Sequence, residues 1–363
     1  MARFIQADIS RSALQHNFQL VKSLAGAARV VAVIKANGYG HGAAEVARSL
    51  PEADIFGVAS IEEALELVES GIRQPVLLLE GFFEASELQE IAHFDFEVVI
   101  HSRDQLDKLL AARLEKPVTV WLKHDSGMHR LGFTSERFRL AYNDLVDSAN
   151  VGAIRLMSHL ACADELDNPF TEQQLDRFES ASADLQGEVS LANSSGLLAW
   201  PRSRGQWVRP GLVLYGCSPF AASHPIANKL RPVMTLRSKV MAIHQLEAGD
   251  GVGYGQAWRA VKPTRVGTVA VGYGDGYPRQ APSGTPILVN GERSQLLGRV
   301  SMDMLSVDLT HLPDAKVGDP VVLWGKGQNG DQLSASEVAR YAGTIPWVLL
   351  TGITSRVPLN YHD

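Results

Sequence analysis

Short apolar runs alternate with amphipathic segments over the first two-thirds of the chain. The runs have the length and β-branched composition of buried strands, and the segments between them carry apolar residues at three- and four-residue spacing. This alternation predicts parallel strands joined by crossover helices. Eight strands are expected, at residues 30–35, 55–60, 75–80, 96–101, 117–123, 153–159, 189–193 and 206–209. The longer helices are expected at 61–70, 102–114, 135–149 and 171–185.

The expected strands share a feature at their carboxyl ends, where nearly every one finishes in a polar group. Eight βα units are the count of a TIM barrel, although an open doubly wound sheet has the same local pattern. In a barrel the strand ends converge on one mouth, whereas an open sheet spreads them along an edge, so the polar ends favour the barrel. The end groups are Lys35, Ser60, Glu80, His101, Lys123, His159, Asn193 and Arg209.

The pattern changes near residue 231. From there on, short alternating runs are separated by turn-forming residues, which is typical of an antiparallel β domain. The runs lie at 234–243, 265–273, 285–290, 304–309 and 319–324, and one helix is expected at 334–343. We therefore expect an α/β fold with an N-terminal TIM (β/α)8 barrel over residues 1–230 and a C-terminal, mostly antiparallel β domain over residues 231–363.

Composition and charge narrow the classes of partner. The 363-residue chain has 34 Lys and Arg against 40 Asp and Glu, a net charge of −6, so we expect no nucleic-acid or membrane binding. No apolar run approaches the ~20 residues of a membrane helix, and the N-terminus lacks the apolar stretch of a secretory signal. The two cysteines, Cys162 and Cys217, cannot form a disulfide framework. These features predict a soluble, cytoplasmic protein.

The segment VVAVIKANGYGHG (30–42) carries the most distinctive chemistry. Burial at a strand end favours the neutral form of a lysine such as Lys35, and a neutral amine is a nucleophile that forms Schiff bases with carbonyls. The glycines that follow let backbone and the Tyr39 phenol approach a ligand. The alternative is a lysine that reaches past the strand end to solvent, which is the usual fate of a strand-end lysine.

The string K-A-N-G-Y-G-H-G resembles the cofactor-attachment motif of alanine racemases, which are pyridoxal-phosphate enzymes with an N-terminal barrel and a C-terminal β domain. Further segments resemble family segments in the family's order, so the resemblance covers essentially the full chain. They are LKHDSGMHRLGF (122–133), MSHLA (157–161), ANSSG (192–196), WVRPGLVLYG (207–216), VGYGQAW (252–258), GYGDGYPR (272–279) and GRVSMDM (298–304). The resemblance implies interconversion of L- and D-alanine, either to supply D-alanine for peptidoglycan or for alanine catabolism.

The resemblance implies two catalytic residues. Lys35 is similar to the lysine that forms a Schiff base with the cofactor, and Tyr254 to a second base. Racemisation takes a proton from one face of a planar Cα and returns one to the other, so the two groups must lie on opposite faces. The resemblance implies that Lys35 removes and returns the α-proton of the D-enantiomer, and that Tyr254 does so for the L-enantiomer. Because a tyrosine is a poor base at its ordinary pKa, it needs hydrogen-bonding support, which the resemblance assigns to His159 and Arg209.

Other implied roles concern the cofactor ring and the substrate carboxylate. Arg209 resembles the arginine that donates a hydrogen bond to the pyridine nitrogen. Because an arginine keeps its proton, this nitrogen would stay unprotonated and the ring would withdraw electrons less strongly. Arg130 resembles the arginine that contacts the cofactor phenolic oxygen and the substrate carboxylate. Lys123 resembles a lysine that is carbamylated and orients that arginine. Met302 resembles the residue whose backbone amide holds the substrate carboxylate.

The resemblance also implies a phosphate site, an entrance and a partner subunit. Phosphate binding falls to Tyr39, Ser194 and the amides of Gly211 and Leu212, with Asn193 nearby. Each active site takes Tyr254 and Met302 from a second copy, so a homodimer is implied. The entrance residues implied are Asp164, Tyr273, Arg279 and Arg299.

Several other interpretations compete with this one. A related decarboxylase is disfavoured because such relatives use a glycine-rich phosphate loop and this chain has no Gly-Gly dipeptide. A broader-specificity amino-acid racemase stays open, and a non-catalytic pyridoxal-phosphate protein is disfavoured by the β domain. The string GKGQNG (325–330) fits a dinucleotide-binding pattern but is expected to be a turn, because no βαβ unit surrounds it. His124 and His129 lack the partners of a metal site, so no metal is expected.

Overall fold

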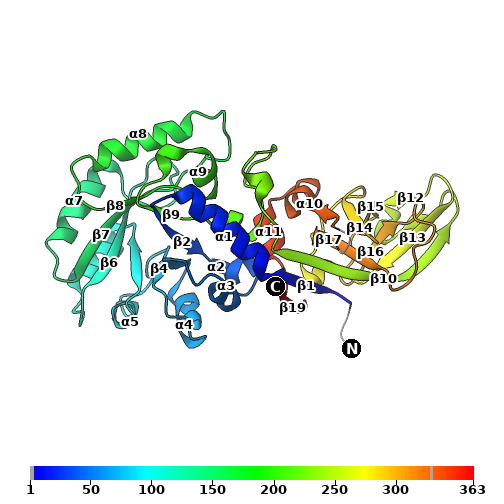
Figure 1. The fold of residues 1–363 in the computed structure, drawn as a ribbon, viewed down its shortest axis with the longest axis horizontal. Coiled ribbons are helices and arrows are strands. Elements are labelled where there is room, and N and C mark those ends of the chain that lie inside the picture. Colours follow the sequence, from blue (N-terminus) through cyan, green and yellow to red (C-terminus); the bar gives the residue numbers. More distant parts are fainter. Residues whose placement is uncertain (1–3, 328–329) are drawn as a thin grey trace.

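The computed structural model describes residues 4–327 and 330–363. Two bodies lie side by side in Figure 1, a barrel of strands ringed by helices and a β domain into which the long strand β10 extends. Helix α1 begins at the junction between the two bodies, directly after β1, and runs across the barrel (Figure 1).

The barrel is closed and consists of eight parallel strands. Each strand pairs with the next, and the first pairs with the last through Arg29 with Trp207 and Val30 with Val208. All eight expected runs overlap these strands, and the predicted barrel is confirmed. The strands are β2 (Arg29–Val33), β3 (Ile55–Val58), β4 (Val76–Leu78), β5 (Glu97–Ile100), β6 (Val118–Lys123), β7 (Val151–Met157), β8 (Glu188–Ser190) and β9 (Trp207–Val208).

Helices cover the outside of the barrel, and their sequences show why they form. In α4 the side chains of Ile61, Ala64 and Leu67 are buried at three-residue spacing, and Glu62 and Glu63 place negative charge in the first turn. The four expected helices correspond to α4, α6, α7 and α8. The helices of the barrel half are α1 (Arg11–Ala25), α2 (Lys35–Gly40), α3 (Ala43–Ser49), α4 (Ile61–Glu69), α5 (Glu87–His93), α6 (Arg103–Ala111), α7 (Ser135–Val146), α8 (Phe170–Ser182) and α9 (Ser194–Ala199).

The floor of the barrel interior, at the amino ends of the strands, is a neutralised charge cluster. Arg155 on β7 pairs with Glu97 and, at 3.1 Å, with Glu188. Its guanidinium lies 4.5 Å from the centre of the Trp207 ring, and the Trp207 indole N–H donates to Glu188 at 2.8 Å. Trp121 donates to Glu97 at 2.5 Å. Every charge and indole N–H in this cluster therefore has a partner inside the barrel.

The β domain is built on a nine-stranded sheet in the order β18-β17-β14-β15-β16-β13-β10-β1-β19. A further pairing of β10 with β17 curls the sheet back on itself. All the pairings are antiparallel except that of β1 with β19, so the predicted mostly antiparallel domain is confirmed. The strands are β1 (Gln6–Ser10), β10 (Met234–Leu246), β13 (Thr264–Val269), β14 (Pro286–Val289), β15 (Glu292–Leu297), β16 (Leu305–Asp308), β17 (Pro320–Lys326), β18 (Gln332–Leu333) and β19 (Leu359–His362), beside the separate hairpin β11 (Gly251–Val252) and β12 (Trp258–Arg259).

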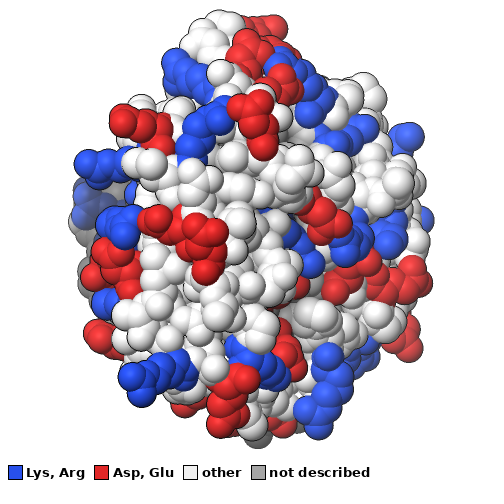
Figure 2. All heavy atoms as spheres, turned by 90° about the vertical axis from the view of Figure 1, so that its left-hand side faces the viewer, with Lys and Arg blue, Asp and Glu red and all other residues white. Residues whose placement is uncertain are grey.

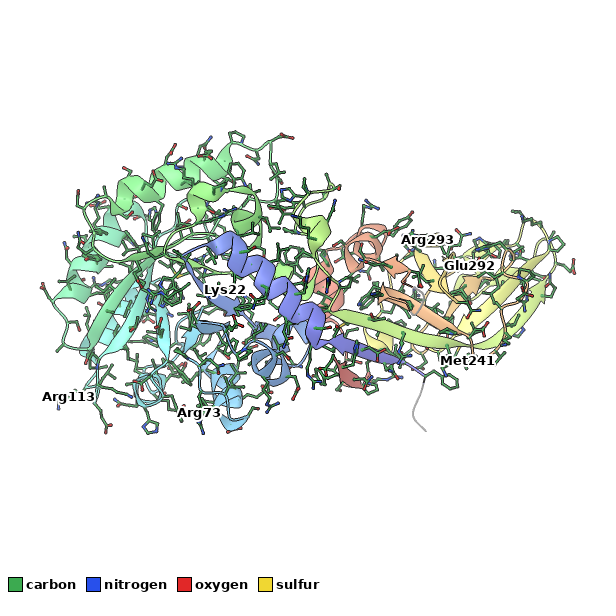
Figure 3. The ribbon with its side chains drawn as sticks, viewed as in Figure 1. Lys22, Arg73, Arg113, Met241, Glu292 and Arg293 are labelled. Atoms are coloured by element: carbon green, nitrogen blue, oxygen red, sulfur yellow. The ribbon has the colours of Figure 1, made fainter. Side chains whose placement is uncertain are left out.

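One feature of the C-terminal half differs from the expectation. The helix expected at 334–343 forms as α10 (Ala335–Tyr341), but a second helix, α11 (Pro346–Thr351), follows it. At six residues α11 is too short to show a helical period in the sequence. Arg293, at the edge of the β domain in Figure 3, donates at 2.8 and 2.7 Å to Glu337 of α10 and ties this helix to β15.

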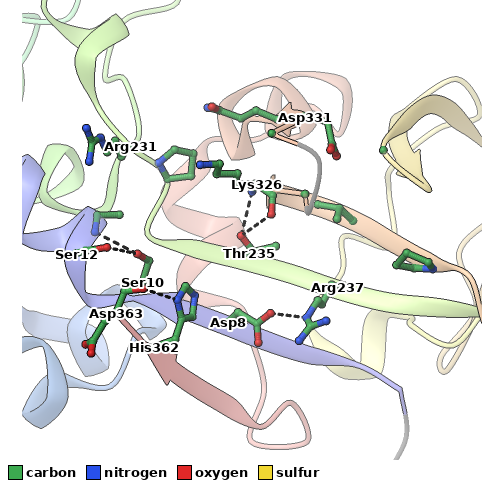
Figure 4. Close-up of a pocket in the computed structure, with 18 of the residues that line it drawn as sticks. Asp8, Ser10, Ser12, Arg231, Thr235, Arg237, Lys326, Asp331, His362 and Asp363 are labelled. Atoms are coloured by element: carbon green, nitrogen blue, oxygen red, sulfur yellow. Dashed lines mark hydrogen bonds and ion pairs between the residues drawn. The ribbon is translucent and has the colours of Figure 1, made fainter.

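A cavity of about 910 Å³ opens where the two bodies meet, between β1, β10 and the end of β17 (Figure 4). The Asp8–Arg237 ion pair and the Thr235–Lys326 hydrogen bond cross its wall. None of the residues predicted for the site lines it, so this larger cavity is not the expected active site. The string GKGQNG borders it, but its residues 328 and 329 lie outside the described residues.

One face of the barrel has no field of a single charge. Lys and Arg mix with Asp and Glu over the barrel face shown in Figure 2. Among the described residues, no helix is long and apolar enough to cross a membrane.

Candidate active site

A cavity of about 570 Å³ lies at the mouth of the barrel, where the strands end. Ten of the residues predicted from the sequence line it. Among them is Lys35, which follows β2 by two residues. Because parallel strand ends converge at one face of a barrel, residues more than 170 positions apart meet here. The ten are Lys35, Tyr39, Lys123, Arg130, His159, Asn193, Ser194, Arg209, Gly211 and Leu212.

The turn that follows Lys35 has left-handed backbone. Ala36, Asn37, Gly38 and Tyr39 have φ of 52–60° and ψ of 39–52°. This conformation costs roughly 1–2 kcal/mol for each residue with a Cβ atom, so the turn has to be held by its surroundings. Asn37 helps to hold it, because its side-chain oxygen accepts the N–H of Ala43 at 2.9 Å.

The other end of the turn is fixed by aromatic packing. The Tyr39 ring stacks on Tyr215 with 4.6 Å between ring centres. Burial raises the pKa of Tyr39 to about 12, although a hydrogen bond from Trp347 of α11 opposes this shift, so its hydroxyl is a neutral hydrogen-bonding group. A Cβ on Gly40 would lie 2.1 Å from the carbonyl oxygen of Leu350, so α11 packs directly on the turn.

Arg209 is the most buried charge of the cavity, at 4% exposure. It donates at 2.8 Å to the carbonyl of Ser190, at 2.6 Å to its hydroxyl and at 2.6 Å to the carbonyl of Ser158. Burial lowers the pKa of Arg209 to about 10, which still leaves it charged at neutral pH. Because these partners are neutral acceptors, they do not cancel its positive charge.

His159 lies beside this arginine. The Nη2 atom of Arg209 is 3.4 Å from Nδ1 of His159, and since a guanidinium can only donate, Nδ1 is the acceptor. Burial, and then the charges of Arg209 and Lys123, hold the pKa of His159 well below its ordinary value. The histidine is therefore a neutral link between Arg209 and the cavity.

Lys123 and Arg130 come from β6 and the loop after it. Burial lowers the pKa of Lys123 to about 8, with further lowering by Arg209, Arg130 and Lys35. Asp125 shapes the loop by accepting the N–H groups of Gly127 and His129, each at 3.0 Å.

A set of neutral donors and hydroxyls lines the cavity near β9. The Gly211 N–H donates to the Ser194 hydroxyl at 3.0 Å, and a Cβ on Gly211 would lie 2.4 Å from the Tyr39 hydroxyl. Asn193 caps α9 by accepting the Gly196 N–H at 2.9 Å. The backbone, two hydroxyls and an amide thus converge as expected for a phosphate site.

The charge balance of the cavity shows what it can hold. Four cations, Lys35, Lys123, Arg130 and Arg209, line it against one carboxylate, Glu80. This excess suits a ligand with several negative groups beside a lysine that can bond to a carbonyl. Trp347 also lines the cavity and was not expected from the sequence. It comes from α11, more than 130 residues after the last barrel strand, and no local pattern marks it.

The remaining predicted residues do not line the cavity. Tyr254 lies in the turn between β11 and β12 and is 69% exposed, and Met302 is 52% exposed. Tyr273 and Arg299 adjoin them: the Tyr273 N–H donates to Ser301 at 3.0 Å, and Arg299 is next to the turn of Tyr254. We call Tyr254, Tyr273, Arg299 and Met302 the β-domain patch.

Two more predicted entrance residues are exposed, and of these Arg279 adjoins the β-domain patch. Asp164 is in the loop after β7, and the Arg279 guanidinium lies 5.9 Å from the centre of the Tyr273 ring. Within one copy of the chain, therefore, the structure brings together the residues predicted to hold a cofactor but does not bring Tyr254 and Met302 to them.

A closed parallel barrel with a lysine-bearing, cationic mouth suits an enzyme that binds an anionic carbonyl compound. Comparison with known proteins identifies the family. The model for the alanine racemase N-terminal domain matches residues 9–219, and that for the C-terminal domain matches residues 233–361. The chain belongs to the alanine racemase family, whose members depend on pyridoxal phosphate.

Curated proteins and solved structures agree with this assignment. The alanine racemase of Pseudomonas taetrolens is 55% identical over 357 residues, and the catabolic alanine racemase of Pseudomonas putida is 54% identical, each alignment covering 98% of both chains. The biosynthetic alanine racemase from Pseudomonas aeruginosa has a TM-score of 0.96 at 46% identity and matches 99% of this chain and 100% of that one.

Proposed function

We propose that the protein is an alanine racemase that interconverts L- and D-alanine with pyridoxal phosphate. The observation that carries this proposal is the single cavity lined by all nine predicted cofactor-contacting residues, in a chain whose whole length matches the family. Both biosynthetic and catabolic enzymes occur among the named relatives.

The cavity fits pyridoxal phosphate in charge and in shape. Its four cations match a phosphate, a phenolic oxygen and a substrate carboxylate, and the Tyr39 and Ser194 hydroxyls lie beside Gly211, where the phosphate is proposed to bind. When bound, the cofactor withdraws electron density from Cα of the attached amino acid and so acidifies its Cα–H bond.

Lys35 and Tyr254 are the proposed proton carriers. Lys35 Nζ takes the α-proton of D-alanine and returns one to make D-alanine, while Tyr254 Oη does the same for L-alanine. The two atoms must approach Cα from opposite sides. The exposure of Tyr254 on the β-domain patch supports its delivery to the cavity of another copy.

Arg209 and His159 are proposed to support both the ring and the second base. A buried guanidinium that stays charged donates to the pyridine nitrogen without giving up its proton, which keeps electron withdrawal moderate and limits side reactions. The neutral His159 extends this hydrogen-bonding chain towards the place that Tyr254 would occupy.

Arg130 and Met302 are proposed to hold the substrate carboxylate, Arg130 through its guanidinium and Met302 through its backbone N–H. We further propose that Lys123 carries a carbamate. Its lowered pKa leaves an appreciable neutral fraction, whose amine adds to carbon dioxide and releases one proton, and the resulting anion would face Arg130.

We propose a homodimer because Tyr254, the proposed second base, is exposed and does not line the cavity of its own copy. We expect entrance residues Asp164, Tyr273, Arg279 and Arg299 to lie where the two copies meet. A substitution that separates the copies should abolish racemisation but leave the cofactor bound, which sedimentation and absorbance together would show. The division into domains at residue 230 and the cytoplasmic location stay predictions.

The proposal is tested with L-alanine in deuterium oxide, followed by proton NMR and chiral analysis. The expected result is deuterium at Cα together with D-alanine. If neither appears, the proposal is wrong. Serine and other small amino acids in parallel reactions separate an alanine-specific enzyme from a broader-specificity racemase, because a few extra atoms at Cα change discrimination by only ~1–3 kcal/mol.

A further inference from the structure

Glu63 of α4 bridges two backbone N–H groups at the barrel mouth. One carboxylate oxygen accepts the N–H of Ala36 at 2.7 Å and the other accepts that of Ala59 at 2.7 Å. Ala36 directly follows Lys35, and Ala59 directly follows β3. The carboxylate therefore joins the ends of β2 and β3 beyond the point where the strands themselves pair, the last register pair being Val33 with Gly57.

The bond to Ala36 falls on the first residue of the left-handed turn. Ala36 has φ 52° and ψ 52°, a conformation that an alanine avoids unless its surroundings impose it. The charge-assisted bond from the Ala36 N–H to Glu63 orients the peptide between Lys35 and Ala36, and the bond from the Ala59 N–H anchors the carboxylate at the end of β3. With Gly38 N–H donating to Ile34 at 2.7 Å on the inner side, the backbone of Lys35 is held from both sides.

We propose that Glu63 is a positioning residue for Lys35, and this inference rests on the proposed function. Its carboxylate fixes the direction in which Lys35 leaves the strand end and so keeps Nζ over one face of the substrate Cα. Glu63 does not line the cavity and touches no reacting atom. Its effect therefore falls on the face served by Lys35 and spares the face served by Tyr254.

A conservative substitution separates this role from general packing. Glu63→Gln keeps the shape of the side chain. Its amide has one oxygen where the carboxylate has two, so one of the hydrogen bonds from the Ala36 and Ala59 N–H groups must break. Glu66→Gln on the same helix is the matched control, since Glu66 is exposed and lies one turn further from the strand ends.

The experiment measures deuterium exchange at Cα of D-alanine and of L-alanine with the holoenzyme of each variant. Because misplacement by about 1 Å can slow a reaction about a hundredfold, Glu63→Gln should slow exchange of D-alanine by roughly ten- to a hundredfold, and that of L-alanine by much less. The pH at which the lysine-bound cofactor changes its visible absorbance should also shift. Glu66→Gln should match the unaltered protein in both measurements.

A second variant keeps the test decisive. Glycine reaches positive φ without strain, so Ala36→Gly in the Glu63→Gln background should recover part of the D-alanine exchange. Equal slowing of both enantiomers, an unchanged absorbance titration, or a double variant no faster than Glu63→Gln would each overturn the assignment. Failure of the unaltered protein to exchange either enantiomer would instead overturn the proposed function.

Discussion

Each end of the barrel interior holds a largely buried arginine. The two arginines differ in the charge of their partners. Arg155 at the floor pairs with two carboxylates and packs over indole rings. Arg209 at the mouth donates to carbonyls, a hydroxyl and a histidine, so its charge is not cancelled by these partners.

This difference shows which end is built for a ligand. A buried charge without a counter-charge is costly, and the floor avoids the cost by pairing. The mouth keeps Arg209 and three further cations against Glu80 alone. The excess is explained when an anionic cofactor and substrate complete the site. Changes at the mouth should therefore alter catalysis, and changes at the floor should alter stability.

The largest effect is expected for Lys35→Ala at the mouth. Loss of the amine removes both the covalent link to the cofactor and one proton carrier, so racemisation should fall about a thousandfold or more while the urea midpoint changes little. Borohydride reduction followed by mass spectrometry measures the link. If the variant still carries covalently attached cofactor after reduction, another lysine forms the link.

At the floor, Arg155→Ala should lower the free energy of unfolding by about 3–5 kcal/mol, because it leaves the largely buried Glu97 carboxylate without its ion-pair partner, whereas Glu188 keeps its pair with Arg29. Burial already raises the pKa of Glu97, with Arg155 opposing that shift. Urea unfolding measures the change, and activity per folded molecule should persist. Arg202→Ala is the control. Arg202 pairs with three acids, but it lies on the surface, where ion pairs contribute little to the free energy of unfolding.

Tyr254→Phe tests whether the mouth lacks a second base of its own. We expect racemisation to slow in both directions by roughly a hundredfold, because Tyr254 takes the α-proton of L-alanine and also returns the proton that makes L-alanine, with the cofactor on Lys35 still reducible by borohydride. Initial rates from each pure enantiomer measure it. Undiminished rates in both directions would place the second base within the cavity of one copy.

The smallest effect concerns the pH dependence of stability at the mouth. The pKa of Lys123 falls from its ordinary 10.5 to about 8 in the folded protein, so between these values the unfolded chain binds more protons. Stability contributed by this group therefore rises with pH, by about 1 kcal/mol between about pH 7 and about pH 9. Urea unfolding of the apoprotein without carbon dioxide tests this, and Lys123→Met should remove the rise.

Much of the barrel could be predicted because its signals are local. Apolar strands carry a period that the sequence shows, and a polar residue at a strand end, such as Lys123 or Asn193, marks the mouth. The roles of Tyr254 and Met302 came only from the resemblance to a family, since nothing in their neighbourhood in the sequence indicates a base or a carboxylate site.

The rest depends on contacts between distant segments. Left-handed φ values at Ala36 and Tyr39 contradict residue preference and are imposed by Glu63, α11 and ring stacking. Trp347 reaches the cavity only because α11 packs on that turn. Strands β1 and β19 are too short and too far apart in the sequence for a pairing to be inferred.

Strand β1 leaves the ribosome first and β19 last, yet the two are parallel neighbours, and Asn360 donates at 3.1 Å to Asp8 across a separation of 352 residues. Closing so long a loop cannot precede the local contacts of the barrel. We expect the nascent chain to complete its barrel while one edge of β1 stays unpaired until β19 is made, so this edge is open to pairing with another strand for that time.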